Sequence, residues 1–70
     1  MNGHEFFKKI KKYGKANNLT VDFVAHEGKG SHGTLYLGGK RTILKDRNKE
    51  IGSGLLRSML ADLGIDPKKF

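Results

Sequence analysis

The chain lacks several features that define whole classes of protein. None of its 70 residues is cysteine, so neither a disulfide framework nor a thiolate metal site can stabilise it. It has no hydrophobic run near the roughly 20 residues of a membrane span. Its first stretch, "MNGHEFFKKIKKYGK", has no apolar signal-peptide core. We therefore expect one small soluble domain over residues 1–70, located in the cytoplasm.

Acidic residues are also scarce. Seven Asp and Glu stand against 14 Lys and Arg, which gives a formal net charge of +7. Such a balance favours a polyanionic partner: nucleic acid, an anionic membrane or an acidic protein. Any single lysine is typical of a solvated surface, but the whole set favours a polyanion. A second basic group follows the lysines of the N-terminal segment: Lys29, Lys40, Arg41, Lys45, Arg47 and Lys49.

The first segment with helical periodicity spans about residues 3–16. Phe6, Ile10 and Tyr13 recur at helical spacing, and lysines occupy the opposite face. Asn2 is a good N-cap, and Glu5 stands three residues later, as in a capping box. The segment therefore predicts an amphipathic helix whose apolar face the core needs.

A second helix is predicted after the polar loop of residues 46–54, with Ser53 as its N-cap. Gly64 is expected to follow its last turn, and Pro67 prevents its resumption. Its apolar residues form two rows at i, i+4 spacing: Leu55, Met59 and Leu63, then Leu56 and Leu60.

Three stretches between the helices predict strands, over residues 19–27, 34–37 and 41–45. The first alternates, with Leu19, Val21, Phe23 and Ala25 on one side. "GGK" at 38–40 is a hairpin turn signal. The expected fold is α+β with the order αβββα: a three-stranded antiparallel sheet with both helices on one face. This arrangement resembles that of double-stranded RNA-binding domains and leaves one sheet face free for a partner.

The stretch "GKGSHGTLY", residues 28–36, holds a histidine between glycines. Alternation along an extended strand points His32, Thr34 and Tyr36 toward the open face, and Leu35 and Leu37 toward the core. The three glycines would let the backbone approach a ligand closely, and a lysine adds positive charge beside them. These four residues are Gly28, Gly30, Gly33 and Lys29.

A histidine at this place fits a specific chemistry. Its imidazole gives or takes a proton near neutral pH, and RNA carries its own nucleophile, the 2′-hydroxyl. A placed acid or base with some phosphate stabilisation is therefore enough to cleave RNA without a metal. The residues alone leave the other interpretation open, since a lone histidine in a glycine-rich loop is usually an ordinary surface residue.

The remaining polar candidates carry weaker signals. Ser31 fits turn geometry or a phosphate contact better than a nucleophile, and Tyr36 fits base stacking and strand packing equally well. His4 lies in the first turn of a helix, where a cation is disfavoured, and His26 ends a strand. These histidines, without a carboxylate cluster at ligand spacing, make a poor metal site, so neither a metal nor another cofactor is expected.

The chain resembles the HicA toxin family, the small mRNA interferases of HicA–HicB toxin–antitoxin pairs. The resemblance covers nearly the whole chain in the order of its elements. It is most specific in "GKGSHGTLYLGGKRTILKDRNKEIG" and in "GLLRSMLADLGI". Gly30, Ser31 and His32 match the family's Gly-Ser-His at the start of the second strand. Many members carry an aromatic residue three positions after the histidine, where this chain has Leu35 followed by Tyr36.

The resemblance implies that His32 is catalytic, that the protein cleaves RNA, and that a HicB antitoxin covers the active face. We therefore expect an mRNA-cleaving ribonuclease with His32 as general acid/base. RNA is expected to contact Lys29, Gly30, Ser31, Tyr36, Arg41, Lys45, Arg47 and Lys49. One alternative is a non-catalytic RNA-binding module that uses the same basic sheet face. Another is a nucleic-acid-binding subunit whose only task is to hold a protein partner.

Overall fold

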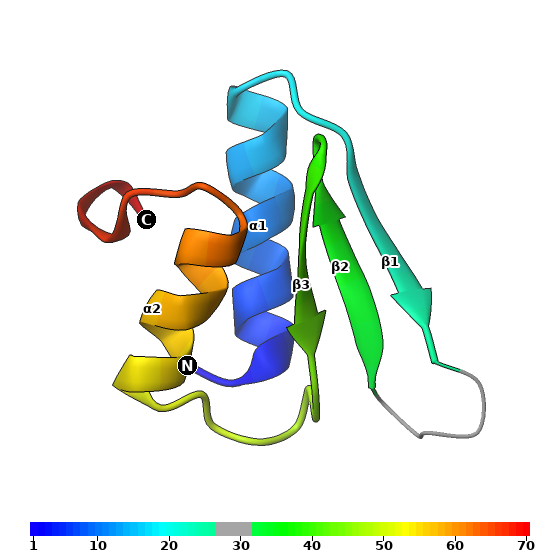
Figure 1. The fold of residues 1–70 in the computed structure, drawn as a ribbon, viewed down its shortest axis with the longest axis vertical. Coiled ribbons are helices and arrows are strands. Elements are labelled where there is room, and N and C mark those ends of the chain that lie inside the picture. Colours follow the sequence, from blue (N-terminus) through cyan, green and yellow to red (C-terminus); the bar gives the residue numbers. More distant parts are fainter. Residues whose placement is uncertain (27–31) are drawn as a thin grey trace.

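A computed structural model describes residues 1–26 and 32–70 of the chain. It confirms the expected αβββα order (Figure 1). The elements are α1 (Gly3–Ala16), β1 (Val21–Ala25), β2 (Gly33–Leu37), β3 (Lys40–Leu44), α2 (Ser53–Asp62) and a short 3-10 helix, η1 (Pro67–Lys69). In the described part of the chain, no helix combines the length and the apolar character that crossing a membrane requires.

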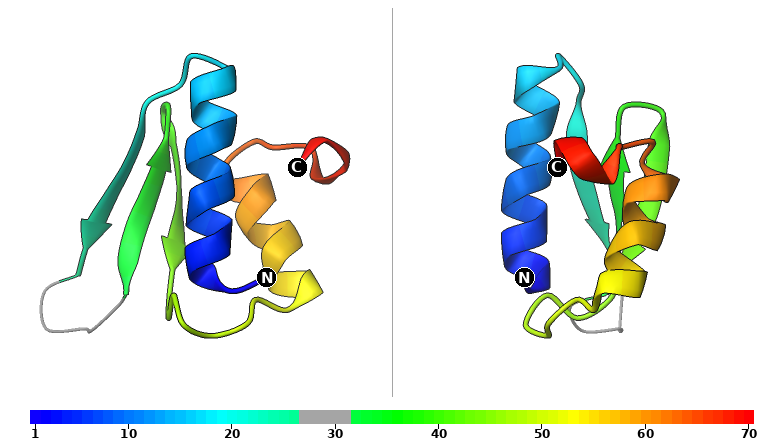
Figure 2. Two further views of the ribbon diagram at one scale, coloured as in Figure 1. Left: turned by 180° about the vertical axis from the view of Figure 1, so that it is seen from behind. Right: turned by 90° about the vertical axis from the view of Figure 1, so that its left-hand side faces the viewer.

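The sheet is antiparallel with the strand order β1-β2-β3, as the sequence predicted. Leu35 in the central strand pairs with Phe23 on one side and with Thr42 on the other. Both helices cover the same face of the sheet, and no element of the described residues covers the opposite face (Figures 1 and 2). The fold is therefore α+β with one open sheet face.

The core lies between the sheet and the two helices. Leu35 and Leu37 are buried there, as predicted. The predicted inward row of β1 is only partly right, because Leu19 precedes the strand and is 40% exposed and Ala25 is also exposed. Within the described part of the chain, ten hydrophobic residues form the buried cluster: Phe6, Ile10, Leu35, Leu37, Leu44, Ile51, Met59, Leu60, Leu63 and Ile65.

The start of α1 is set by local hydrogen bonds. The Asn2 side chain accepts from the Glu5 backbone at 2.9 Å, and the Glu5 carboxylate accepts from the Asn2 backbone at 2.9 Å. This reciprocal pair is the capping box that the sequence predicted. The helix boundaries 3 and 16 are confirmed as well.

The start of α2 differs from the prediction. Gly52 is the N-cap, without a side-chain hydrogen bond, and Ser53 is the first helical residue. Ser53 cannot cap the helix because it already lies inside it. The other end is as predicted, since Gly64 follows the last turn with a φ of 71°, a left-handed conformation that suits glycine.

Candidate functional site

His32 lies one step beyond the last paired residues of the sheet. Ala25 pairs with Gly33, and Gly33 pairs with Leu44. The His26 backbone N–H donates to the His32 carbonyl at 2.8 Å, which continues the β1–β2 ladder by one residue. The β2–β3 register, continued in the same way, brings Lys45 opposite His32 on the other side. A histidine and a lysine therefore flank His32.

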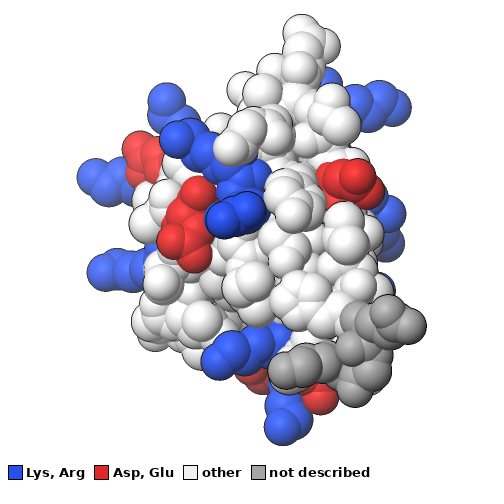
Figure 3. Space-filling view, turned by 45° about the vertical axis from the view of Figure 1, so that its right-hand side comes forward, with Lys and Arg blue, Asp and Glu red and all other residues white. Residues whose placement is uncertain are grey.

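Alternation along the strands places His26, His32 and Lys45 in one row on the open face, as predicted for His32. Two further rows follow along the sheet: Val24, Thr34 and Ile43, then Asp22, Tyr36 and Arg41. The middle of this face is largely uncharged, and charged side chains of both signs, most of them basic, lie around it (Figure 3). At one end of the face Asp22 stands in the same row as Arg41, so the open face is not basic throughout.

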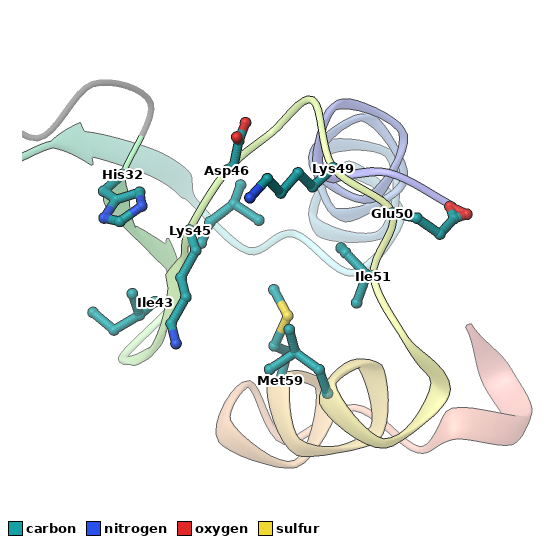
Figure 4. Close-up of a pocket in the computed structure, with 10 residues that line it drawn as sticks. His32, Ile43, Lys45, Asp46, Lys49, Glu50, Ile51 and Met59 are labelled. Atoms are coloured by element: carbon teal, nitrogen blue, oxygen red, sulfur yellow. The ribbon is translucent and has the colours of Figure 1, made fainter.

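A hollow of about 240 Å³ opens beside His32, between the end of β3, the loop that follows it and α2 (Figure 4). One part of its wall is charged and includes Lys45 and Lys49 together with His32, and the Lys49 side chain extends toward His32 (Figure 4). The other part is apolar: Ile43, Leu44, Ile51, Leu55 and Met59. The hollow therefore joins an imidazole, two cations, the carboxylate residue Asp46 and an apolar surface.

The loop that carries both lysines is fastened to the start of α1. The His4 backbone N–H donates to the Arg47 carbonyl at 3.1 Å, and the Ile51 N–H donates to the Met1 carbonyl at 2.8 Å. Within the loop, the Asp46 carboxylate accepts from the Asn48 backbone at 2.9 Å. These bonds make the position of the lysines depend on α1, which is distant in sequence.

The carboxylate of Glu50 turns away from the hollow (Figure 4). It forms an ion pair of 2.7 Å with the Met1 amino group. Although Glu50 lines the hollow, its negative charge is thus directed elsewhere. A phosphate beside Lys45 and Lys49 would not face this carboxylate.

The predicted RNA-contacting residues fall into separate groups. Lys45 and Lys49 share the hollow with His32. Tyr36 and Arg41 are direct cross-strand partners on the open face. Tyr36 is four residues from His32, about 13 Å along an extended strand, and lines no part of the hollow. The predicted contacts Lys29, Gly30 and Ser31, and also Gly28, lie outside the described residues.

Arg47 is held apart from Lys45 and Lys49 although it belongs to the same loop. Its guanidinium carbon lies 4.9 Å from the centre of the Phe23 ring, and its Nε is buried without a hydrogen-bond partner. Phe23 faces the helix side and also contacts Phe7, at 5.6 Å between ring centroids. The side chain of Arg47 is therefore packed against Phe23 and does not line the hollow.

Core packing requires a glycine at residue 33. It is buried, and a Cβ at this residue would collide with the ring of Phe23 rather than meet a ligand. Its lack of a side chain therefore serves core packing.

The sequence reasoning missed His26 as a site residue. Its Nε2 lies 2.9 Å from the Thr34 hydroxyl, and it stands opposite His32 in the ladder. The alternation of β1 was the one available signal, because it put His26 on the open face. Its pairing with His32 required the register of the hairpin, which the sequence left undetermined.

The comparisons with known proteins add no relative. No protein-family model matches the chain, and no curated protein or solved structure does so either.

Among residues 1–26 and 32–70, no three His, Asp or Glu side chains are grouped to hold a metal ion. By their chemistry, the residues at the hollow can transfer a proton, hold a phosphate and contact an apolar ring.

Proposed function

We propose that this chain is a metal-independent ribonuclease that cleaves mRNA, and that it acts as the toxin of a toxin–antitoxin pair in the cytoplasm. The observation that carries the proposal is the position of His32, between His26 and Lys45 and at the wall of a hollow that also holds Lys49. The resemblance to HicA toxins in the Gly-Ser-His motif supports the same activity.

The proposed reaction is attack of an RNA 2′-oxygen on the adjacent phosphorus. A general base takes the proton of the 2′-hydroxyl as the new P–O bond forms, and a general acid gives a proton to the 5′-oxygen as its bond to phosphorus breaks. The products are a 2′,3′-cyclic phosphate and a 5′-hydroxyl. Two proton transfers are needed, and His26 and His32 are two adjacent groups able to make them.

The charge of the reacting phosphate also needs a counterpart. Negative charge grows on its non-bridging oxygens in the transition state, and nearby cations lower the barrier. Lys45, opposite His32, and Lys49, in the same hollow, suit this role. Lys29 is proposed as a further contact from the sequence alone.

The first test replaces His32 with alanine in purified protein. We expect His32→Ala to lose cleavage of a single-stranded RNA by at least about 100-fold, since acid–base catalysis contributes 10²–10⁴-fold. Added imidazole should restore part of the activity, whereas EDTA should not reduce the activity of the wild-type protein. Retained cleavage by the folded variant, or activity that depends on added Mg²⁺, would contradict the proposed mechanism.

The second test concerns His26. We expect His26→Gln to lower kcat by about 10-fold or more while leaving RNA affinity unchanged, because it removes a proton-transfer group and no charge contact. Thr34→Val is the matched control, since it removes the 2.9 Å contact of the imidazole but keeps the imidazole itself. If Thr34→Val reduces kcat as much as His26→Gln does, His26 acts only through its hydrogen bond.

A non-catalytic RNA-binding module is the second candidate function. Tyr36 and Arg41 favour it, because a stacking ring and a cation lie side by side on the open face, apart from His32. Binding of RNA without any cleavage by the wild-type protein would support this alternative. In both cases, an acidic antitoxin of the HicB type is the proposed protein partner.

A further inference from the structure

We infer that the apolar wall of the hollow is a subsite for one unpaired nucleobase, so that the preferred substrate is single-stranded RNA. This inference rests on the proposed function and adds to it the form of RNA that is cut. It is carried by Ile43 and Leu55, two residues on different elements that line the same hollow as His32.

Both residues are about half exposed. Ile43 on β3 and Leu55 on α2 are each 48% exposed, while Met59, which lines the same hollow, is 3% exposed. Single exposed aliphatic residues need no explanation, but here two of them line one hollow, from the sheet and from α2. Such a surface suits a flat apolar group that enters from solvent.

The charged wall is close enough to belong to the same ligand. Ile43 and Lys45 are two residues apart on one face of the strand, about 6.6 Å in an extended chain. One nucleotide can therefore place its phosphate near Lys45 and its base against Ile43. An apolar peptide side chain would fill the apolar wall but bring no anion to Lys45 and Lys49.

A base that contacts this wall has to be unpaired. In an RNA duplex the bases are stacked and paired, and proteins meet mainly phosphates and 2′-hydroxyls. Enzymes that enclose a base between apolar side chains take it from a single strand or extrude it from the helix. The hollow therefore favours unpaired RNA, even though the fold resembles that of duplex-binding domains.

The sheet provides a matched pair of variants. Val24 and Ile43 flank Thr34 on opposite sides in the register, and they are 50% and 48% exposed. Ile43→Thr removes apolar surface from the hollow. Val24→Thr makes a similar change on the same face, at a residue that does not line the hollow.

The test substrate is a DNA strand with one ribonucleotide, because cleavage then occurs only after that residue. Two abasic versions of this strand are compared with the intact one. One version lacks the base of the ribonucleotide, and the other lacks the base of the nucleotide that follows it. For wild-type protein and Val24→Thr, we expect one of the two abasic strands to lower kcat/KM about fivefold, in line with the loss of one base-stacking contact. For Ile43→Thr the same abasic strand should cause less than a twofold loss. The strand in duplex form should be cut more slowly than the free strand.

Three outcomes would overturn the base subsite without contradicting the proposed ribonuclease activity. They are equal cleavage of the intact and both abasic strands, an equal abasic loss in Ile43→Thr and Val24→Thr, and equal cleavage of duplex and single strand. If no strand is cut, the proposed function fails, and equilibrium binding of the same strands then tests the subsite. An abasic loss of affinity that Ile43→Thr abolishes would support the subsite, and equal affinities would overturn it.

Discussion

Basic residues that are close in sequence have different surroundings in this protein. Lys45 and Lys49 line the hollow beside His32. Arg47, between them, has its guanidinium over the ring of Phe23 and a buried Nε. A cation stacked on an aromatic ring contributes roughly 0.5–2 kcal/mol, depending on how far it is desolvated. We therefore expect the two lysines to act in RNA binding and Arg47 to act in stability.

We predict that Lys45→Gln and Lys49→Gln each reduce the slope of log affinity against log salt by about 0.7, the value for one phosphate contact with a single strand. Arg47→Gln should leave this slope unchanged and lower the free energy of unfolding by about 1 kcal/mol. A 2′-O-methyl RNA, which cannot be cleaved, serves for binding, and urea titration measures stability.

Arg57, an exposed residue of α2 that does not line the hollow, provides the control for charge removal. We expect Arg57→Gln to change neither the salt slope nor the stability appreciably. An Arg47→Gln protein with wild-type stability and a flattened salt slope would instead indicate that Arg47 contacts the RNA.

At the scale of elements, the site depends on the contact between α1 and the loop after β3. The loop bonds to the backbone of Met1 and His4 and thereby fixes the lysines relative to the sheet. Gly3 permits this contact, because a Cβ at residue 3 would lie 2.5 Å from the Arg47 Cα. Because this atom belongs to the backbone, the clash cannot be relieved by rotating a side chain.

We predict that Gly3→Ala lowers the free energy of unfolding by about 1–3 kcal/mol, the usual cost of overpacking. RNA cleavage should fall as well, because the loop has to move and carries Lys45 and Lys49 with it. Urea unfolding and single-turnover cleavage measure the two effects.

Gly54→Ala provides the matched control within α2. A Cβ at residue 54 meets nothing within 4 Å, and alanine favours a helix over glycine by about 1 kcal/mol. This variant should therefore be at least as stable as the wild-type protein. A Gly3→Ala protein that is equally stable and active would show that the loop does not need the close approach to α1.

At the scale of the whole molecule, the net charge of +7 is distributed unevenly over the surface. The open sheet face is largely uncharged in its middle, and the charged side chains around it are mostly basic (Figure 3). An acidic protein partner would find both apolar contacts and cations there, since Val24 and Ile43 are about half exposed. Opposite potentials would steer and orient its approach.

We predict that an acidic antitoxin of the HicB type and RNA compete for this face, because covering the hollow would block His32 without altering it. The measurement is a titration of antitoxin into labelled RNA bound to the His32→Ala protein. RNA should be released in proportion to the antitoxin bound. A stable ternary complex at saturating antitoxin would show that inhibition does not work by covering the hollow.

The sequence by itself determined the elements of this protein and their order. The capping box of Asn2 and Glu5, the alternation that buries Leu35 and Leu37, and the glycine after α2 are signals within a few residues. Such signals act through local hydrogen bonds and through the period at which side chains repeat along an element. These signals could therefore be recognised in the sequence without knowledge of the tertiary structure.

Only the tertiary structure decided which residues meet at the hollow. The pairing of His26 with His32 depends on the hairpin register, and the exposure of Leu55 depends on how α2 rests on the sheet. The direction of Arg47 depends on Phe23, 24 positions away in the chain. These contacts join residues that no local pattern links, because packing between elements sets them and sequence spacing does not.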